Sequence, residues 1–130
     1  MLRDADGAVL VSDAFEVWLW HCHPEKGERT RIIARFRHVF ALLRAFGPAI
    51  GTSHVDRIEG EENIREVRVG HRTGAYRAFF GLAARGSVLL VAHGEVKKCD
   101  RFAPAVYRLA AERVAEAVER YAREGSDRDA

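Results

Sequence analysis

The chain has 130 residues, the size of one compact domain. Its 48% hydrophobic content is too high for a disordered protein, and no apolar run approaches the roughly 18 residues that a membrane span requires. The net charge is only +2, and the first ten residues contain acids and no uninterrupted apolar stretch, which argues against a signal peptide and favours a cytoplasmic protein.

The N-terminal part predicts one strand followed by two helices. A short apolar run over residues 8–11 is typical of a strand, and Ser12 and Asp13 offer capping side chains for a helix that Pro24 separates from the next one. From Glu25 onward, apolar residues recur at helical spacing until Gly47, after which a proline cannot continue the helix. Both helices are amphipathic and are expected to pack on a sheet.

The rest of the chain predicts a run of strands and one final helix. Strands are expected over 54–58, 64–69, 76–82 and 87–92, with a tight turn at 72–74, and the last helix begins at Pro104. Strands and helices are segregated rather than alternating, so the predicted fold class is α+β with an antiparallel meander. We expect a single domain over 1–124 and a flexible tail over 125–130.

Positive charge is concentrated in one segment. Residues 65–101 contain eight Lys or Arg and three acids, so this segment carries +5 and the remainder carries −3. Such a distribution fits an anionic partner such as nucleic acid, although a solvated surface without a ligand would look the same.

Strand alternation brings two of these cations together. If Val67 and Phe80 face the helices, Arg68 and Arg77 must both point from the uncovered face of the sheet, on adjacent strands. Their guanidinium groups could then converge on one phosphate, which arginine binds bidentately.

Several motifs in this order resemble those of the phage-derived HigB-like toxins of the RelE/ParE toxin–antitoxin superfamily. They are the Trp18-Leu19 pair in the first helix, the helix that ends at Gly47-Pro48, Glu66-Val67-Arg68, Tyr76-Arg77-Ala78-Phe79-Phe80, the apolar strand running into His93 and a Lys97-Lys98 turn, and the helix begun by Pro104. The resemblance spans about Val9 to Tyr121.

This resemblance implies a RelE-like fold, a cytoplasmic toxin, a helix-turn-helix antitoxin encoded nearby, and cleavage of messenger RNA on the ribosome. The sequence departs from the family at the acidic Glu59, Glu61 and Glu62, whose charges would oppose RNA binding, and at Cys99-Asp100-Arg101.

Cleavage without a metal needs a base for the ribose 2′-hydroxyl, positive charge near the phosphorane and an acid for the leaving oxygen. The predicted catalytic residues are Arg68, Arg77, His93 and Lys97; the predicted RNA-binding residues are Arg65, His71, Arg72, Lys98 and Arg101, with no metal and no cofactor. His93 is the first choice for proton transfer and His71 the second. Tyr107 and Tyr121 could stack on RNA bases, and Tyr121 fits better in the core.

Each of these residues also has a purely structural interpretation. The arginines could pair with Glu66 on an exposed strand, and His93 could be a hydrogen-bonded strand end. Two other functions therefore stay open, a ParE-like inhibitor of DNA gyrase that catalyses nothing and a degenerate homologue that only binds antitoxin or RNA. His21-Cys22-His23 lacks the further ligands that a zinc site would require.

Overall fold

A computed structural model describes residues 2–6, 9–47, 55–58, 61–97 and 102–129. The elements in chain order are β1 (Leu2–Asp6), β2 (Val9–Ser12), α1 (Asp13–Trp20), α2 (Lys26–Phe46), β3 (Val55–Ile58), β4 (Glu61–His71), β5 (Gly74–Ala83), a short 3₁₀ turn (Ala84–Gly86), β6 (Val88–Lys97) and α3 (Pro104–Asp129). The α+β class is confirmed. In the described part of the chain, no helix is both long and apolar enough to cross a bilayer.

The strands form one six-stranded sheet in the order β1-β2-β6-β5-β4-β3. Neighbouring strands are antiparallel except β2 and β6, which run parallel with Val9 opposite Leu89. The sheet is therefore mixed rather than a purely antiparallel meander, because the chain returns to β2 only after two helices and three strands. As predicted for a strand apolar on both faces, β6 lies in the interior of the sheet.

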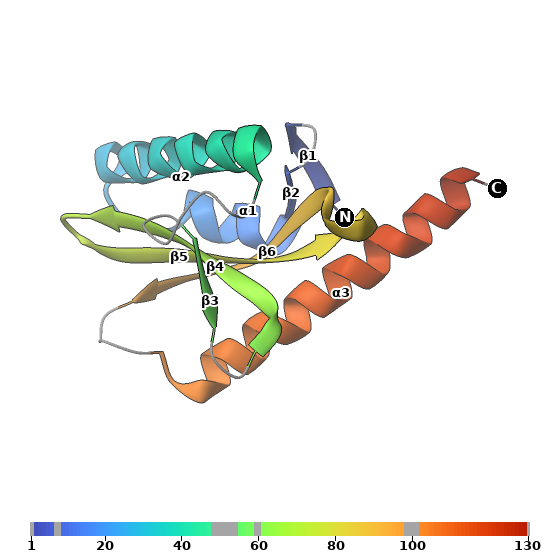
Figure 1. Cartoon of the computed structure of the whole chain (residues 1–130). Helices are drawn as coiled ribbons and strands as arrows, with labels where there is room; N and C mark the ends of the chain where they lie inside the picture. Colours follow the sequence, from blue (N-terminus) through green and yellow to red (C-terminus); the bar gives the residue numbers. More distant parts are fainter. Residues whose placement is uncertain (1, 7–8, 48–54, 59–60, 98–101, 130) are drawn as a thin grey trace.

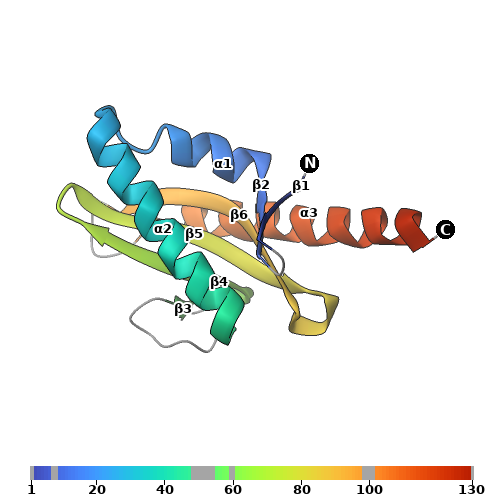
Figure 2. The same ribbon diagram turned by 90° about the horizontal axis from the view of Figure 1, so that it is seen from above.

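The three helices lie on both faces of the sheet (Figures 1 and 2). On one face, α1 and α2 bury a core that includes Phe15, Phe36, Val67 and Phe80. On the other, α3 packs Ala110 and Val114 against a second core that contains Phe79. The expectation that the face opposite α1 and α2 is uncovered is wrong, since α3 crosses part of it.

Local sequence signals explain the ends of the first two helices. The Ser12 hydroxyl accepts a hydrogen bond from the Phe15 amide at 3.1 Å and caps α1 as predicted. Gly47 ends α2 with a φ of 75°, a left-handed conformation that costs glycine little.

Two elements are longer than the sequence predicts. Strand β6 continues to Lys97, so His93 lies within a strand and does not end it, and Lys97 belongs to the strand rather than to a turn. Helix α3 runs to Asp129, through most of the segment for which we expected a flexible tail.

Candidate nucleic-acid interface

Strands β4 and β5 place Arg68 and Arg77 directly opposite each other. Residues on either side of them, Val67 and Ala78, lie in the core under α1 and α2, so alternation turns both arginines to the α3 side of the sheet. The tight turn that joins the strands fixes this register, with His71 opposite Gly74. The predicted placement of the two arginines on one face of adjacent strands is what the structure shows, and their convergence on a phosphate stays a prediction.

Two acids balance these cations. Arg68 forms ion pairs with Asp56 on β3 and with Glu66 on its own strand, the latter at 3.3 Å between Nε and Oε1. The Arg77 Nε atom lies 3.9 Å from the same Glu66 oxygen. Like charges that face each other across a ladder are destabilising, so Glu66 and Asp56 offset a repulsion that the register imposes.

Two buried atoms at this place have no hydrogen-bond partner among the described residues: Glu66 Oε2 and Arg77 Nε. Glu66 is only 6% exposed and the Arg77 side chain 12%. Burial, more than any neighbouring charge, lowers the pKa of Arg77. Unsatisfied buried polar atoms cost roughly 1–3 kcal/mol each and are rare in folded proteins. A ligand that brings an acceptor to Arg77 and a hydroxyl to Glu66 would satisfy both.

Aromatic residues from the start of α3 and the segment before it lie beside this pair. Tyr107 packs edge-on against Phe79 and Phe102, with ring centroids 6.1 and 5.7 Å away, and Lys97 Nζ lies 5.9 Å from the centre of the Phe102 ring. Electrostatic interaction with Tyr107 also contributes to the pKa of Arg77. Cations interleaved with aromatic rings suit RNA, whose bases stack and whose phosphates need charge.

His93 lies deeper under α3 and is fully engaged. An Arg113 N–H donates to Nδ1 at 3.0 Å; because arginine only donates, this assigns the proton to Nε2, which donates to Glu95 at 3.1 Å. Burial lowers the pKa of His93, the Arg113 charge lowers it further, and Glu95 opposes the shift. The imidazole is therefore neutral with both nitrogens in use.

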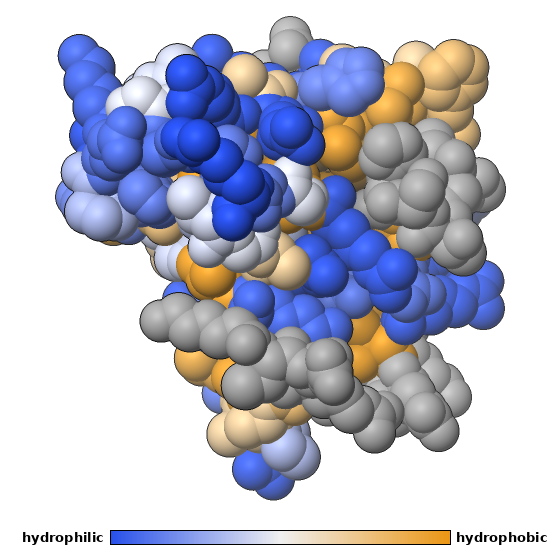
Figure 3. Space-filling view, turned by 90° about the vertical axis from the view of Figure 1, so that its left-hand side faces the viewer, coloured by the Kyte–Doolittle hydropathy of each residue, from blue (hydrophilic) through white to orange (hydrophobic). Residues whose placement is uncertain are grey.

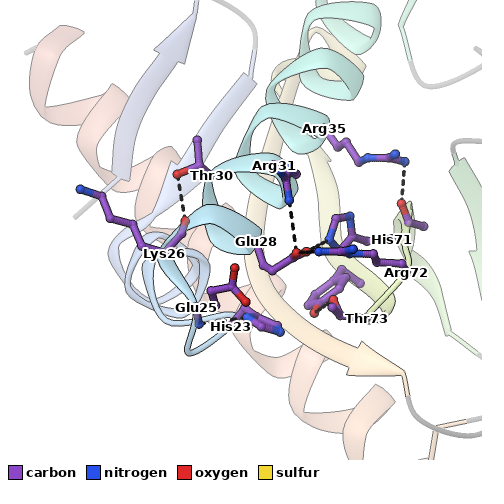
Figure 4. A network of polar contacts seen from close by, with 12 residues as sticks. His23, Glu25, Lys26, Glu28, Thr30, Arg31, Arg35, His71, Arg72 and Thr73 are labelled. Atoms are coloured by element: carbon purple, nitrogen blue, oxygen red, sulfur yellow. Dashed lines mark hydrogen bonds and ion pairs between the residues drawn. The ribbon is translucent and has the colours of Figure 1, made fainter.

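His71 and Arg72 belong to a different surface. His71 shares the face of Val69 and pairs with Glu28 of α2, to which Arg72 also binds (Figure 4). The structure thus separates His71 from the arginine pair by the thickness of the sheet. Arg65 lies opposite Phe80 and two residues before Val67, so alternation places it on the same face as Val67 and not on the face of Arg68.

The sequence did not single out every residue of this site. Lys98 and Arg101 lie outside the described residues. Asp56, Phe102 and Arg113 were missed, and Glu66 was considered only as a surface partner for arginine. For Asp56 a signal existed, since the sequence places it on the strand next to β4.

Comparison with known proteins relates the chain to one sequence family. Residues 26–115 match the family described as phage-derived protein Gp49-like (DUF891). This match runs from the first residue of α2 into α3 and covers Asp56, Glu66, Arg68, Arg77 and His93. No protein with a curated function matches the chain at a significant level.

Proposed function

This chain belongs to the Gp49-like family of phage-derived, toxin-like proteins, and from that membership we propose that it is a HigB-type toxin and a metal-independent endoribonuclease. The proposed substrate is messenger RNA on the ribosome. The proposed partner is a helix-turn-helix antitoxin encoded nearby, which would keep the toxin inactive until it is needed.

One observation carries the proposal: the buried Glu66 carboxylate lies beside two opposed arginines, and its Oε2 atom has no hydrogen-bond partner among the described residues. In the proposed reaction, Glu66 Oε2 accepts the proton of a ribose 2′-hydroxyl, whose oxygen then attacks the adjacent phosphorus. Arg68 and Arg77 bind the phosphate oxygens and stabilise the charge of the phosphorane.

The reaction is completed by breaking the bond between phosphorus and the 5′-oxygen. The proposed proton donor to that oxygen is the Lys97 ammonium group. On β6, Glu95 lies opposite Arg77, and Lys97 follows two residues later on the same face of the sheet. The products are a 2′,3′-cyclic phosphate and a 5′-hydroxyl. Because both nitrogens of His93 are occupied, we assign it the role of holding Glu95 and Arg113 in place rather than of transferring a proton.

Mapping of transcript ends after induced expression tests the proposal. The wild-type protein should arrest growth and create internal mRNA ends that carry cyclic phosphates, and Arg77→Ala and Glu66→Gln should lose both effects. Loss of one transition-state donor costs roughly 10²–10³-fold in rate, so residual cutting should be barely detectable. Arg120→Ala, an exposed arginine on α3, is the matched control and should cut like wild type.

The thermal transition of each variant shows whether it folds. Purified wild-type protein should cut ribosome-bound mRNA equally well in the presence of a chelator that spares ribosomal magnesium. Growth arrest with DNA breaks and intact transcripts would instead indicate gyrase inhibition and would refute the nuclease.

A second candidate, a homologue that binds RNA or antitoxin without cutting, has one observation in its favour. Asp56 neutralises Arg68 in the free protein and competes with phosphate for the same guanidinium group. Absence of growth arrest, together with RNA binding that depends on Arg77, would support it.

A further inference from the structure

A second concentration of positive charge lies on α2, away from the site described above. The helix contains six Lys or Arg and a single acid, so it carries +5 in a chain whose net charge is +2. That acid, Glu28, is 1% exposed and is bound by His71, by Arg72 and, from α2 itself, by Arg31 at 3.2 Å. The outer surface of α2 therefore presents cations without intervening carboxylates. Figure 3, which views the side on which α2 begins, shows hydrophilic residues gathered over this end of the helix.

Five of these six cations form two rows. Successive side chains on a helix are about 100° apart, so Lys26, Arg37 and Arg44 fall on one line. Arg31 and Arg35, with the imidazole of His38 beside them, fall on a second line about 140° around the helix. Figure 4 shows Lys26 and Arg35 extending to opposite sides of α2. Between the rows lie only small exposed residues: Gly27, Thr30, Ala34, Ala41 and Ala45.

The sheet holds this surface in a fixed orientation. The opposite side of α2 is buried through residues such as Ile32 and Phe36, so both rows face away from the core. Arg35 donates to the carbonyl oxygen of Gly70 on β4 at 2.7 Å, which ties the second row to the sheet. Within the described part of the chain, Arg37 and His38 have no hydrogen bond or ion pair, and both are exposed.

A cleft connects the second row with the arginine pair. It has a volume of about 490 Å³, and Arg35 and His38 line it from α2 while Arg68 and Gly70 line it from β4. Arg68 thus touches both this cleft and the Glu66 site. The cleft therefore leads from the outer face of α2, past the edge of the sheet, to the place where the arginines meet and where Asp56 and Glu66 balance their charge.

We propose that the two cation rows of α2 bind the phosphate backbones of double-helical RNA, whose single-stranded continuation passes along this cleft toward Arg68. Two rows separated by a strip of small residues match two phosphate strands that flank a groove, whereas a single strand would engage only one row. The centre of a protein–protein interface is depleted of charge and rich in aromatic anchors, and the strip between these rows contains neither an aromatic nor a large aliphatic side chain. The proposal extends the proposed function to a second contact with RNA.

The test measures binding of a fluorescently labelled RNA hairpin with a stem of about 16 base pairs by anisotropy over a range of salt concentrations. The protein carries Arg77→Ala, so that binding is measured without cleavage and does not depend on the nuclease proposal. In this background, Lys26→Ala/Arg37→Ala removes two positive charges from the first row, and neither side chain has a hydrogen bond or ion pair among the described residues. Arg35→Ala removes one positive charge from the second row. Arg120→Ala/Arg123→Ala on α3 is the control with the same loss of charge as the double variant.

Each lost phosphate contact lowers the slope of log affinity against log salt by roughly 0.7–0.9. We expect Lys26→Ala/Arg37→Ala to lose about tenfold or more in affinity and more than one unit of slope, and the α3 control to stay within about twofold of its parent. Equal losses in the control and the α2 variant would overturn the proposal. Equal affinity of the parent protein for a single-stranded oligonucleotide of the same length, for duplex DNA or for anionic lipid vesicles would also overturn it.

Discussion

The contact between Trp18 and Gly94 gives a sharp test of how α1 is seated on the sheet. Gly94 lies on β6, and a Cβ atom added there would be 2.1 Å from Cε3 of the Trp18 ring. Carbon atoms in contact are ordinarily about 3.5–4.0 Å apart, so the ring would have to move by roughly 1.5 Å. It has little room to do so, because Phe15 and Phe36 pack against it with centroids 5.5 and 6.0 Å away.

Gly94→Ala should therefore destabilise the protein by about 1–3 kcal/mol, the usual cost of overpacking, and shift the midpoint of urea unfolding without changing its slope. Gly70→Ala on β4 is the matched control: an added Cβ meets nothing within 4 Å there, and its effect should stay within about 0.5 kcal/mol. In a Trp18→Leu background the cost of Gly94→Ala should shrink, since the ring that causes the clash is gone. Equal costs for Gly94→Ala and Gly70→Ala would show that α1 does not rest on β6 in this way.

Four further predictions concern other contacts. Gly81→Ala places a Cβ 2.4 Å from Cγ1 of Val114 and should cost about 1–3 kcal/mol in urea unfolding, less when Val114 is also alanine. Ser12→Ala removes the cap of α1 and should lower stability by about 1 kcal/mol in the same assay. Hydrogen bonds from Arg72 and then His71 lower the pKa of Glu28 from 4.5 to about 2, so wild-type protein should lose thermal stability as the pH falls through this window, and Glu28→Gln should lose less. Asp56→Asn should raise RNA affinity in anisotropy by at most about fivefold, because its partly exposed charge contributes 1 kcal/mol or less.

Local pattern was sufficient to predict the arginine pair. Because side chains alternate along a strand, Arg68 and Arg77 point to the same face of the sheet. The two-residue turn between β4 and β5 permits a single pairing register, which places the two arginines opposite each other. The same alternation places His71, two residues after Val69, on the face that packs against α1 and α2, opposite to the face of the arginine pair. That information was in the sequence, and only the position of His71 at the end of the strand obscured it.

Long-range packing was not accessible in the same way. The apolar stripe of α3 predicts that the helix is buried but not on which face of the sheet, and Phe79 gave no sign that it forms the centre of a second core. The parallel pairing of β2 with β6 joins residues 80 apart in sequence. The partners of Arg68 depend on the pairing of β3 with β4, which includes an irregularity between Arg57 and Ile58.

The acids beside the arginine pair take on a different meaning once the register is known. From sequence, Glu59, Glu61 and Glu62 count as an obstacle to RNA, and Glu66 counts only as a surface partner for arginine. Two guanidinium groups directly opposed on a ladder repel each other, however, and Arg77 is mostly buried, so the free protein needs negative charge there to fold. Glu66 supplies it with a side chain that is 7% exposed, whereas the Asp56 side chain is 38% exposed and is the one that we propose a phosphate displaces. An arriving phosphate would then replace one counterion and leave the other in place to accept a proton, so the arrangement that stabilises the fold without RNA is also the one that the proposed reaction uses.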